Sequence, residues 1–258
     1  MPTSLTLNDH LAALDGAGSR LVELAEKAGL EASVPTCPAW TARALLAHQA
    51  MVHRWAAANV RGEDANAVPS QTEIGTTIED LPAYYREGQA ALLGALRAAP
   101  ADLAAPTFLN DAPPPREFWA RRQAHETTIH MVDALAAALG RAPTADEVDI
   151  DVALAVDGID ELLRGFFTRG RSKLFDGEEY VFAVEAADAD RRWVVRVAER
   201  LTVDPDDASV GADDVAARIT GNAAELYLGL WNRGDEFEVA GPPDLLGRWR
   251  TTQRISWN

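Results

Sequence analysis

The segment Glu117–Leu139 reads EFWARRQAHETTIHMVDALAAAL and is interpreted as one long helix. Prolines 113–115 lead into it and Gly140 follows it, which is the usual placement of Pro before and Gly after a helix. Three further helical segments of about twenty residues precede it. They are expected at about residues 7–28, 36–60 and 77–96. Four such helices in succession predict an antiparallel four-helix bundle.

The sequence pattern changes after Pro143. Helices are expected over 152–167 and 213–231. Short β-branched and aromatic runs at 180–185 and 193–197, and a weaker one at 236–239, are typical of strands. We therefore predict an α+β protein, with an N-terminal bundle over residues 1–142 and a small α+β domain over residues 143–258.

The charge and the cysteine content of the chain limit the partners and the compartment that are expected for it. The 258 residues include 24 basic and 40 acidic side chains, a formal net charge of −16, which disfavours nucleic acid and anionic membrane surfaces. The single cysteine, Cys37, cannot form an intramolecular disulfide, and neither a signal peptide nor a membrane span is apparent. A cytoplasmic protein, monomeric or homodimeric, is expected.

Histidine spacing points to a metal site. Four of the five histidines fall on the second and fourth predicted helices. His125 and His130 are five residues apart, so they face directions about 140° apart on a helix. Glu126 and His130 are four residues apart, about 40° from alignment, and can bind one ion together.

The second helix supplies the third candidate ligand. His48 lies on the apolar stripe of Leu45, Val52 and Trp55, whereas His53 points about 140° away. His48, Glu126 and His130 would leave one position of a tetrahedral zinc open, as in catalytic sites. The alternative is a hydrogen-bonded core histidine, with Glu126 paired to Arg122 one turn earlier.

At these residues the sequence resembles a known family. The stretches CPAWTARALLAH (37–48), VHRW (52–55) and FWARRQAHETTIHMVD (118–133) are similar to the N-terminal metal-binding domain of mycothiol-dependent maleylpyruvate isomerases, a DinB/YfiT-like bundle. The tract from Val203 through Trp231 resembles the sterol-carrier-like domain that follows it in actinobacterial members.

The resemblance implies an activity. It implies Zn²⁺, or another divalent metal, bound by His48, Glu126 and His130, with mycothiol as the low-molecular-weight thiol. A thiol on zinc ionises, and the thiolate adds to a small electrophile, as a cis-trans isomerase or an S-transferase. Two alternatives remain open: a hydrolase with zinc-bound water on the same ligands, and a binding protein without turnover.

Other residues near the predicted ligands have two interpretations each. Asp133 is either an acceptor for a ligand imidazole or a surface carboxylate, and Cys37, placed at a helix start, is taken as a small buried residue. Three tryptophans line the metal pocket or fill the core: Trp40, Trp55 and Trp119. Several arginines bind an anionic substrate or lie at the surface: Arg43, Arg54, Arg121, Arg122, Arg248, Arg250 and Arg254.

Overall fold

A computed structural model describes residues 4–242 and 244–253, which form two compact units. One unit holds Leu5–Phe108 and Ala112–Pro143. The other consists mainly of the residues after Pro143, together with Leu109–Asp111. Within the described part of the chain, no helix combines the length and the apolar character needed to cross a bilayer.

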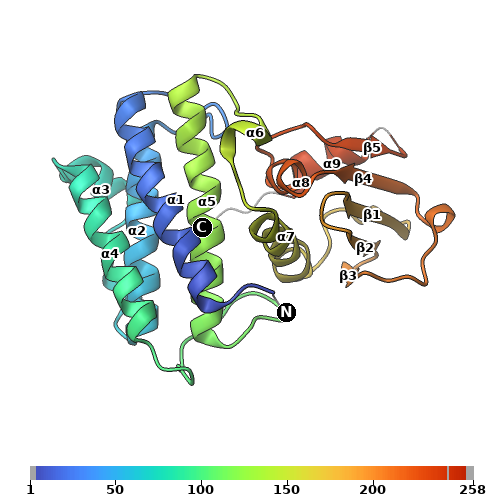
Figure 1. Cartoon of the computed structure of the whole chain (residues 1–258), viewed down its shortest axis with the longest axis horizontal. Helices are drawn as coiled ribbons and strands as arrows, with labels where there is room; N and C mark the ends of the chain where they lie inside the picture. The colour runs from blue at the N-terminus through green and yellow to red at the C-terminus, as the bar shows by residue number, and fades with distance from the viewer. Residues whose placement is uncertain (1–3, 243, 254–258) are drawn as a thin grey trace. The chain divides into compact units, whose positions relative to one another are not determined.

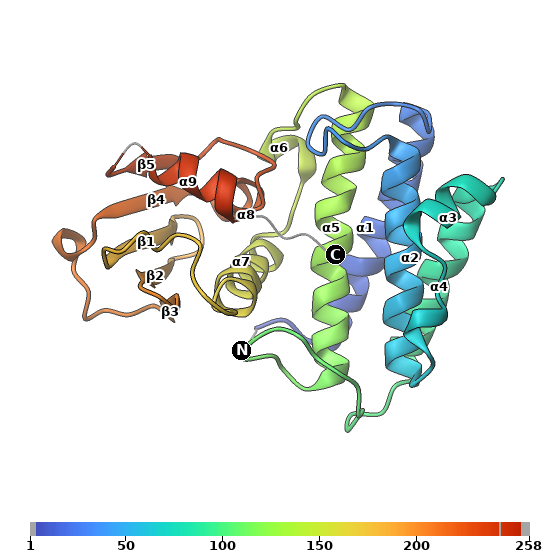
Figure 2. The same cartoon turned by 180° about the vertical axis from the view of Figure 1, so that it is seen from behind.

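The first unit is a bundle of four long helices, seen in Figures 1 and 2. Helix α1 packs on α5 and α4, and α2 packs on α4 and α5. The connection from α2 to α4 contains a 3-10 turn (Ala65–Ala67) and the short helix α3. The helices are α1 (Leu7–Ala28), α2 (Ala42–Arg61), α3 (Gln71–Thr77), α4 (Leu81–Ala98) and α5 (Pro115–Leu139).

Cross-helix hydrogen bonds define the helix directions. Arg54 Nη2 donates to the Tyr84 carbonyl, and Arg61 Nη2 donates to the Ala91 carbonyl. Since both residue numbers rise together, the predicted antiparallel arrangement is wrong for this pair, and α2 and α4 run in the same direction. This is possible because the long connection over residues 62–80 carries the chain back along the bundle.

Two helix boundaries differ from the sequence prediction. Helix α2 begins at Ala42 rather than near Pro38, because the Thr41 side chain accepts a hydrogen bond from Ala44 N and caps it. The predicted helix over 77–96 is interrupted: α3 ends at Thr77, and α4 starts at Leu81, capped by Asp80. The segment 36–40 is therefore a loop, and Cys37 does not lie at a helix start.

The second unit is built on a five-stranded sheet in the order β3-β2-β1-β4-β5. Strands β1 and β4 are parallel, and the other neighbouring pairs are antiparallel. The strands are β1 (Tyr180–Ala186), β2 (Arg191–Val197), β3 (Thr202–Pro205), β4 (Ala217–Gly221) and β5 (Glu238–Ala240). The predicted α+β fold, with a helical N-terminal region, is confirmed.

Helices and aromatic side chains complete this unit. Trp249 of α9 packs against Phe167 and Phe182, with ring centroids 4.9 and 6.3 Å away, and Trp193 of β2 donates through Nε1 to Asp160. The helices are α6 (Ala145–Val148), α7 (Val152–Asp160), continued by a π-helical turn (Glu161–Phe166), α8 (Ala223–Leu230) and α9 (Leu245–Thr252); a 3-10 turn spans Ala212–Asp214.

The expected helix over 213–231 is wrong in its first half. Residues Ala217–Gly221 form β4, which pairs with β1 in parallel register, Phe182 opposite Ala217. Helix α8 begins only after Asn222, whose backbone N–H donates to Glu225 Oε2 in a capping box. The backbone groups of this segment form hydrogen bonds with β1, about 35 residues earlier in the chain. A prediction from the local helical pattern does not take such a distant partner into account.

Candidate metal centre

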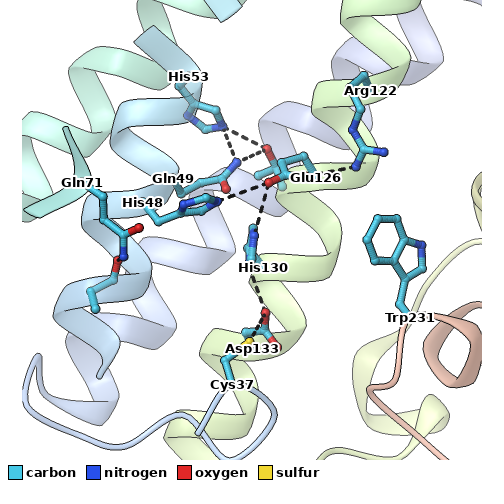
Figure 3. A network of polar contacts seen from close by, with 12 residues as sticks. Cys37, His48, Gln49, His53, Gln71, Arg122, Glu126, His130, Asp133 and Trp231 are labelled. Atoms are coloured by element: carbon cyan, nitrogen blue, oxygen red, sulfur yellow. Dashed lines mark hydrogen bonds and ion pairs between the residues drawn. The ribbon is translucent and has the colours of Figure 1, made fainter. Parts of the chain in front are cut away.

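Helices α2 and α5 bring His48, Glu126 and His130 together, as Figure 3 shows. One oxygen of Glu126, Oε1, lies 3.4 Å from His48 Nε2 and 3.3 Å from His130 Nε2. All three side chains are buried, and their ligand atoms lie within 4.8 Å of one another. Two imidazoles and one carboxylate therefore converge on one point of the bundle core.

Helix geometry explains which histidines take part. Glu126 and His130 are one turn apart on α5, so both face α2. His125 points elsewhere, and its ring lies 6.2 Å from the ring of His10 on α1 in a T-shaped arrangement. His53 contacts Thr127 and Gln49 instead of the carboxylate of Glu126.

The two distances from Glu126 Oε1 to the histidine nitrogens fit a tetrahedral metal ion. Zinc binds histidine nitrogen and carboxylate oxygen at roughly 2.0–2.1 Å, which separates two tetrahedral ligand atoms by about 3.3–3.4 Å. The two nitrogen-to-oxygen distances, 3.4 and 3.3 Å, match this value. The donor set is also one that zinc uses in catalytic sites, where a fourth position stays open.

Asp133 supports His130 from one turn further along α5. Its Oδ2 lies 2.9 Å from His130 Nδ1, and the Asp133 side chain is fully buried. A proton on Nδ1 leaves Nε2 directed at Glu126, the tautomer that metal binding through Nε2 requires. Of the two interpretations of Asp133, the structure therefore supports the acceptor for the His130 imidazole and not the surface carboxylate.

The loop before α2 reaches the same carboxylate. Thr36 Oγ1 donates to Asp133 Oδ1 at 2.6 Å, and the Cys37 thiol lies 3.5 Å from Oδ2. Hydrogen bonds from Cys37 N to the Val34 carbonyl and from Trp40 N to the Cys37 carbonyl hold the loop closed. Cys37 is half-buried and contacts a residue that supports a candidate ligand.

Trp40, at the end of this loop, covers the two histidine rings. Its ring centroid lies 4.8 Å from that of His48 and 5.7 Å from that of His130, and it stacks on the latter at 29°. Trp55 and Trp119 instead pack on each other, with ring centroids 5.0 Å apart. Of the three tryptophans considered from the sequence, Trp40 lines the site and the other two belong to an aromatic cluster.

Of the arginines considered from the sequence, some contact the candidate site and others lie away from it. Arg122 Nη2 lies 3.2 Å from Glu126 Oε2, so it contacts the oxygen that does not face the histidines. Arg54 lies over the Tyr84 ring and donates to backbone carbonyls, and Arg43 pairs with the exposed Glu31. In the second unit Arg248 pairs with Asp176. The predicted candidate Arg254 lies outside the described residues.

Contacts within the site change the protonation of two of its members. Burial by itself raises the pKa of Glu126, but hydrogen bonds from His130 and His48 hold it well below its usual range. Burial by itself lowers the pKa of His130, but hydrogen bonds to Asp133 and Glu126 raise it to about 9. Without a metal, an imidazolium and a carboxylate therefore form a buried ion pair at neutral pH.

Sequence reasoning placed His53 away from the ligands but missed the cluster of three buried polar residues to which it belongs. Gln49, His53 and Thr127 form hydrogen bonds with one another between α2 and α5. Gln49 directly follows His48, and Thr127 directly follows Glu126. The signal in the sequence was the polar residue that directly follows each of these two predicted ligands.

Comparisons with known proteins cover both units. The profile of the mycothiol maleylpyruvate isomerase N-terminal domain matches residues 11–135, and the MDMPI C-terminal domain profile matches residues 153–248. A crystal structure of the mycothiol-dependent maleylpyruvate isomerase has a TM-score of 0.63 at 17% identity, and a variant with one histidine replaced by alanine has a TM-score of 0.65 at 17% identity. Each alignment covers 93% of this chain and 96% of the other, a similarity of fold. No curated protein sequence matches the chain.

Proposed function

Because this chain belongs to the mycothiol-dependent maleylpyruvate isomerase family, we propose that it is a zinc-dependent enzyme that uses mycothiol as its thiol. The reaction is isomerisation of a small electron-poor alkene or transfer of the thiol to it. The observation that carries the proposal is the placement of two histidine nitrogens, at 3.3 and 3.4 Å, around one oxygen of Glu126.

The residues of this chain divide the work of holding the metal. His48 and His130 would bind it through Nε2, and Glu126 through Oε1. Arg122 contacts the other oxygen of Glu126 and holds the carboxylate in one orientation. When bound, the divalent ion lowers the pKa of a coordinated thiol, so that the thiolate is present at neutral pH.

The charges of these residues favour anionic reactants. Both metal-binding imidazoles would be neutral, and the negative charge of Glu126 is balanced by Arg122 beside it. The buried carboxylate of Asp133 beside His130 then compensates part of the charge of the ion, and the remaining positive charge lies in a buried site, where charges interact strongly. This local field is opposite in sign to the net charge of −16 of the chain, and it supports a thiolate and a carboxylate-bearing substrate as ligands.

Metal content tests the first part of the proposal. Protein purified without a histidine tag is expected to hold one divalent ion per chain by elemental analysis. His48→Ala and Glu126→Gln are expected to lose it, whereas Glu23→Gln, on the exposed surface of α1, retains it. A parent protein without bound metal, or variants with undiminished metal, would contradict the assignment.

Thiol dependence tests the second part. After cobalt substitution, mycothiol is expected to produce a thiolate-to-metal charge-transfer band, and turnover of maleylpyruvate is expected only when mycothiol is present. Cys37→Ala is expected to keep this dependence, because the reacting sulfur comes from the added thiol. Turnover without any thiol would favour the hydrolase, and metal binding without turnover would favour a binding protein.

A further inference from the structure

A second buried polar cluster joins α2 and α5 beside the candidate ligands. Gln49 Nε2 lies 3.0 Å from both His53 Nε2 and Thr127 Oγ1, and Thr127 Oγ1 lies 2.9 Å from His53 Nε2. All three side chains are fully buried. We call Gln49, His53 and Thr127 the polar clamp; Figure 3 labels Gln49 and His53 and marks the contact between them.

Two residues of the clamp are direct neighbours of candidate ligands in the sequence. Gln49 follows His48 on α2, and Thr127 follows Glu126 on α5. A helix rises about 1.5 Å per residue, so a slide of α2 along α5 by one residue breaks contacts of 2.9–3.0 Å in the clamp. The same slide separates His48 from Glu126, because each ligand moves with its neighbour.

Burial makes the clamp selective for one arrangement. Gln49 Oε1 and His53 Nδ1 have no hydrogen-bond partner among the described residues. A shifted register would also leave Gln49 Nε2, His53 Nε2 and Thr127 Oγ1 without partners in a fully buried place, which costs more than an exposed hydrogen bond gains. Burial also lowers the pKa of His53 to about 3. The ring is therefore neutral and adds no positive charge beside the ion.

We propose that Gln49, His53 and Thr127 are positioning residues: they hold α2 and α5 in the register at which His48, Glu126 and His130 converge. This inference rests on the proposed metal centre. The inference predicts that removal of the Thr127 hydroxyl weakens metal binding while the protein remains folded, although no clamp residue binds the ion.

Adjacent threonines on α5 provide a matched test. Thr127→Val removes the clamp hydroxyl and keeps the shape of the side chain. Thr128→Val makes the same change at the next residue, which is 2% exposed and whose hydroxyl has no hydrogen-bond partner among the residues that the structure describes. Thr127→Ser restores the hydroxyl, and Gln49→Met removes a different clamp contact if Thr127→Val does not fold.

The probe is Co²⁺ added to the metal-free full-length protein, with affinity and visible absorption both measured, and with folding monitored by circular dichroism. Thr127→Val and Gln49→Met are expected to bind Co²⁺ about tenfold more weakly than the parent and to alter the visible spectrum. Thr127→Ser and Thr128→Val are expected to resemble the parent.

Two results would overturn the inference, and they differ from each other. If the parent binds Co²⁺ and folded Thr127→Val binds it equally well, or if Thr128→Val loses as much affinity, the clamp has no positioning role and the proposed function stands. If the parent itself binds no Co²⁺, the proposed metal centre fails and the inference fails with it.

Discussion

Asp133 Oδ2 lies 2.9 Å from Nδ1 of His130, one turn back on α5, while Nε2 of the same ring faces Glu126. The second oxygen of Asp133 accepts from Thr36 Oγ1, so the carboxylate is held from two sides. This arrangement fixes the orientation of His130 before a metal binds, and it keeps the proton on Nδ1 when Nε2 loses its proton to bind the ion.

Replacement of Asp133 should therefore weaken metal binding. Asp133→Asn removes the charged acceptor, and the affinity for Co²⁺ is expected to fall roughly ten- to a hundredfold. Asp102→Asn, at an exposed turn, is the control. Competition with a chelator measures the affinity; equal affinity of Asp133→Asn and parent would show that the hydrogen bond to His130 does not support the ligand.

The affinity for metal is expected to rise with pH. The pKa of His130 in the metal-free protein is about 9, and the imidazolium must lose a proton before Nε2 can bind an ion. Apparent affinity should increase about tenfold per pH unit up to about pH 9 and then level off. Co²⁺ titrations between pH 6.5 and 9.5 measure this. An affinity that stays constant from pH 7 to 9 would contradict it.

Acid should destabilise the bundle through His53. Burial lowers the pKa of this residue from 6.5 to about 3, so the unfolded chain binds a proton that the folded protein excludes. The contribution of neutral His53 is fully present above pH 6.5 and is lost as the pH falls towards 3. The free energy of unfolding of the parent should fall more steeply than that of His53→Gln, by up to about 1.4 kcal/mol per pH unit.

Denaturant unfolding of the metal-free protein from pH 6.5 to 4.5 measures this difference in slope, whatever the stability of the variant at neutral pH. This pH range lies between the two pKa values of His53, 6.5 and about 3, so the difference in slope reports the protonation of this ring. If the free energy of unfolding falls equally steeply with pH in parent and His53→Gln, the folded protein protonates this ring as readily as the unfolded chain does, which would contradict the prediction.

Trp40 should report metal binding. Its ring lies within 6 Å of the His48 and His130 ring centroids, at 4.8 and 5.7 Å, so Co²⁺ between these residues is expected to quench its fluorescence. Trp40→Phe should lose the larger part of the Co²⁺-induced quenching, whereas Trp119→Phe, whose ring packs on Trp55 within the bundle, should keep that part. Full quenching in Trp40→Phe would place the ion elsewhere.

Local spacing was sufficient for part of the fold and of the candidate site. The expected helices over 7–28 and 117–139 correspond to α1 (Leu7–Ala28) and α5 (Pro115–Leu139). The pairing of Glu126 with His130, and the different direction of His125, follow from the helical repeat alone. These predictions succeed because they concern residues within one or two turns of each other.

Other features depend on contacts between distant segments. The strand Ala217–Gly221 exists because β1 pairs with it, and the contact between Thr36 and Asp133 joins residues 97 positions apart. Trp40, Trp55 and Trp119 could not be separated by sequence, since their surroundings come from other helices and from the loop before α2.

The sequence by itself determined the helical nature of the first half of the chain and the residue types that can hold a metal. Only the tertiary structure decided how α2 lies against α5, and hence which polar side chains, Asp133 and the polar clamp among them, surround His48, Glu126 and His130. The physical reason is that helical periodicity sets the direction of a side chain on its own helix, whereas its partners depend on packing between helices.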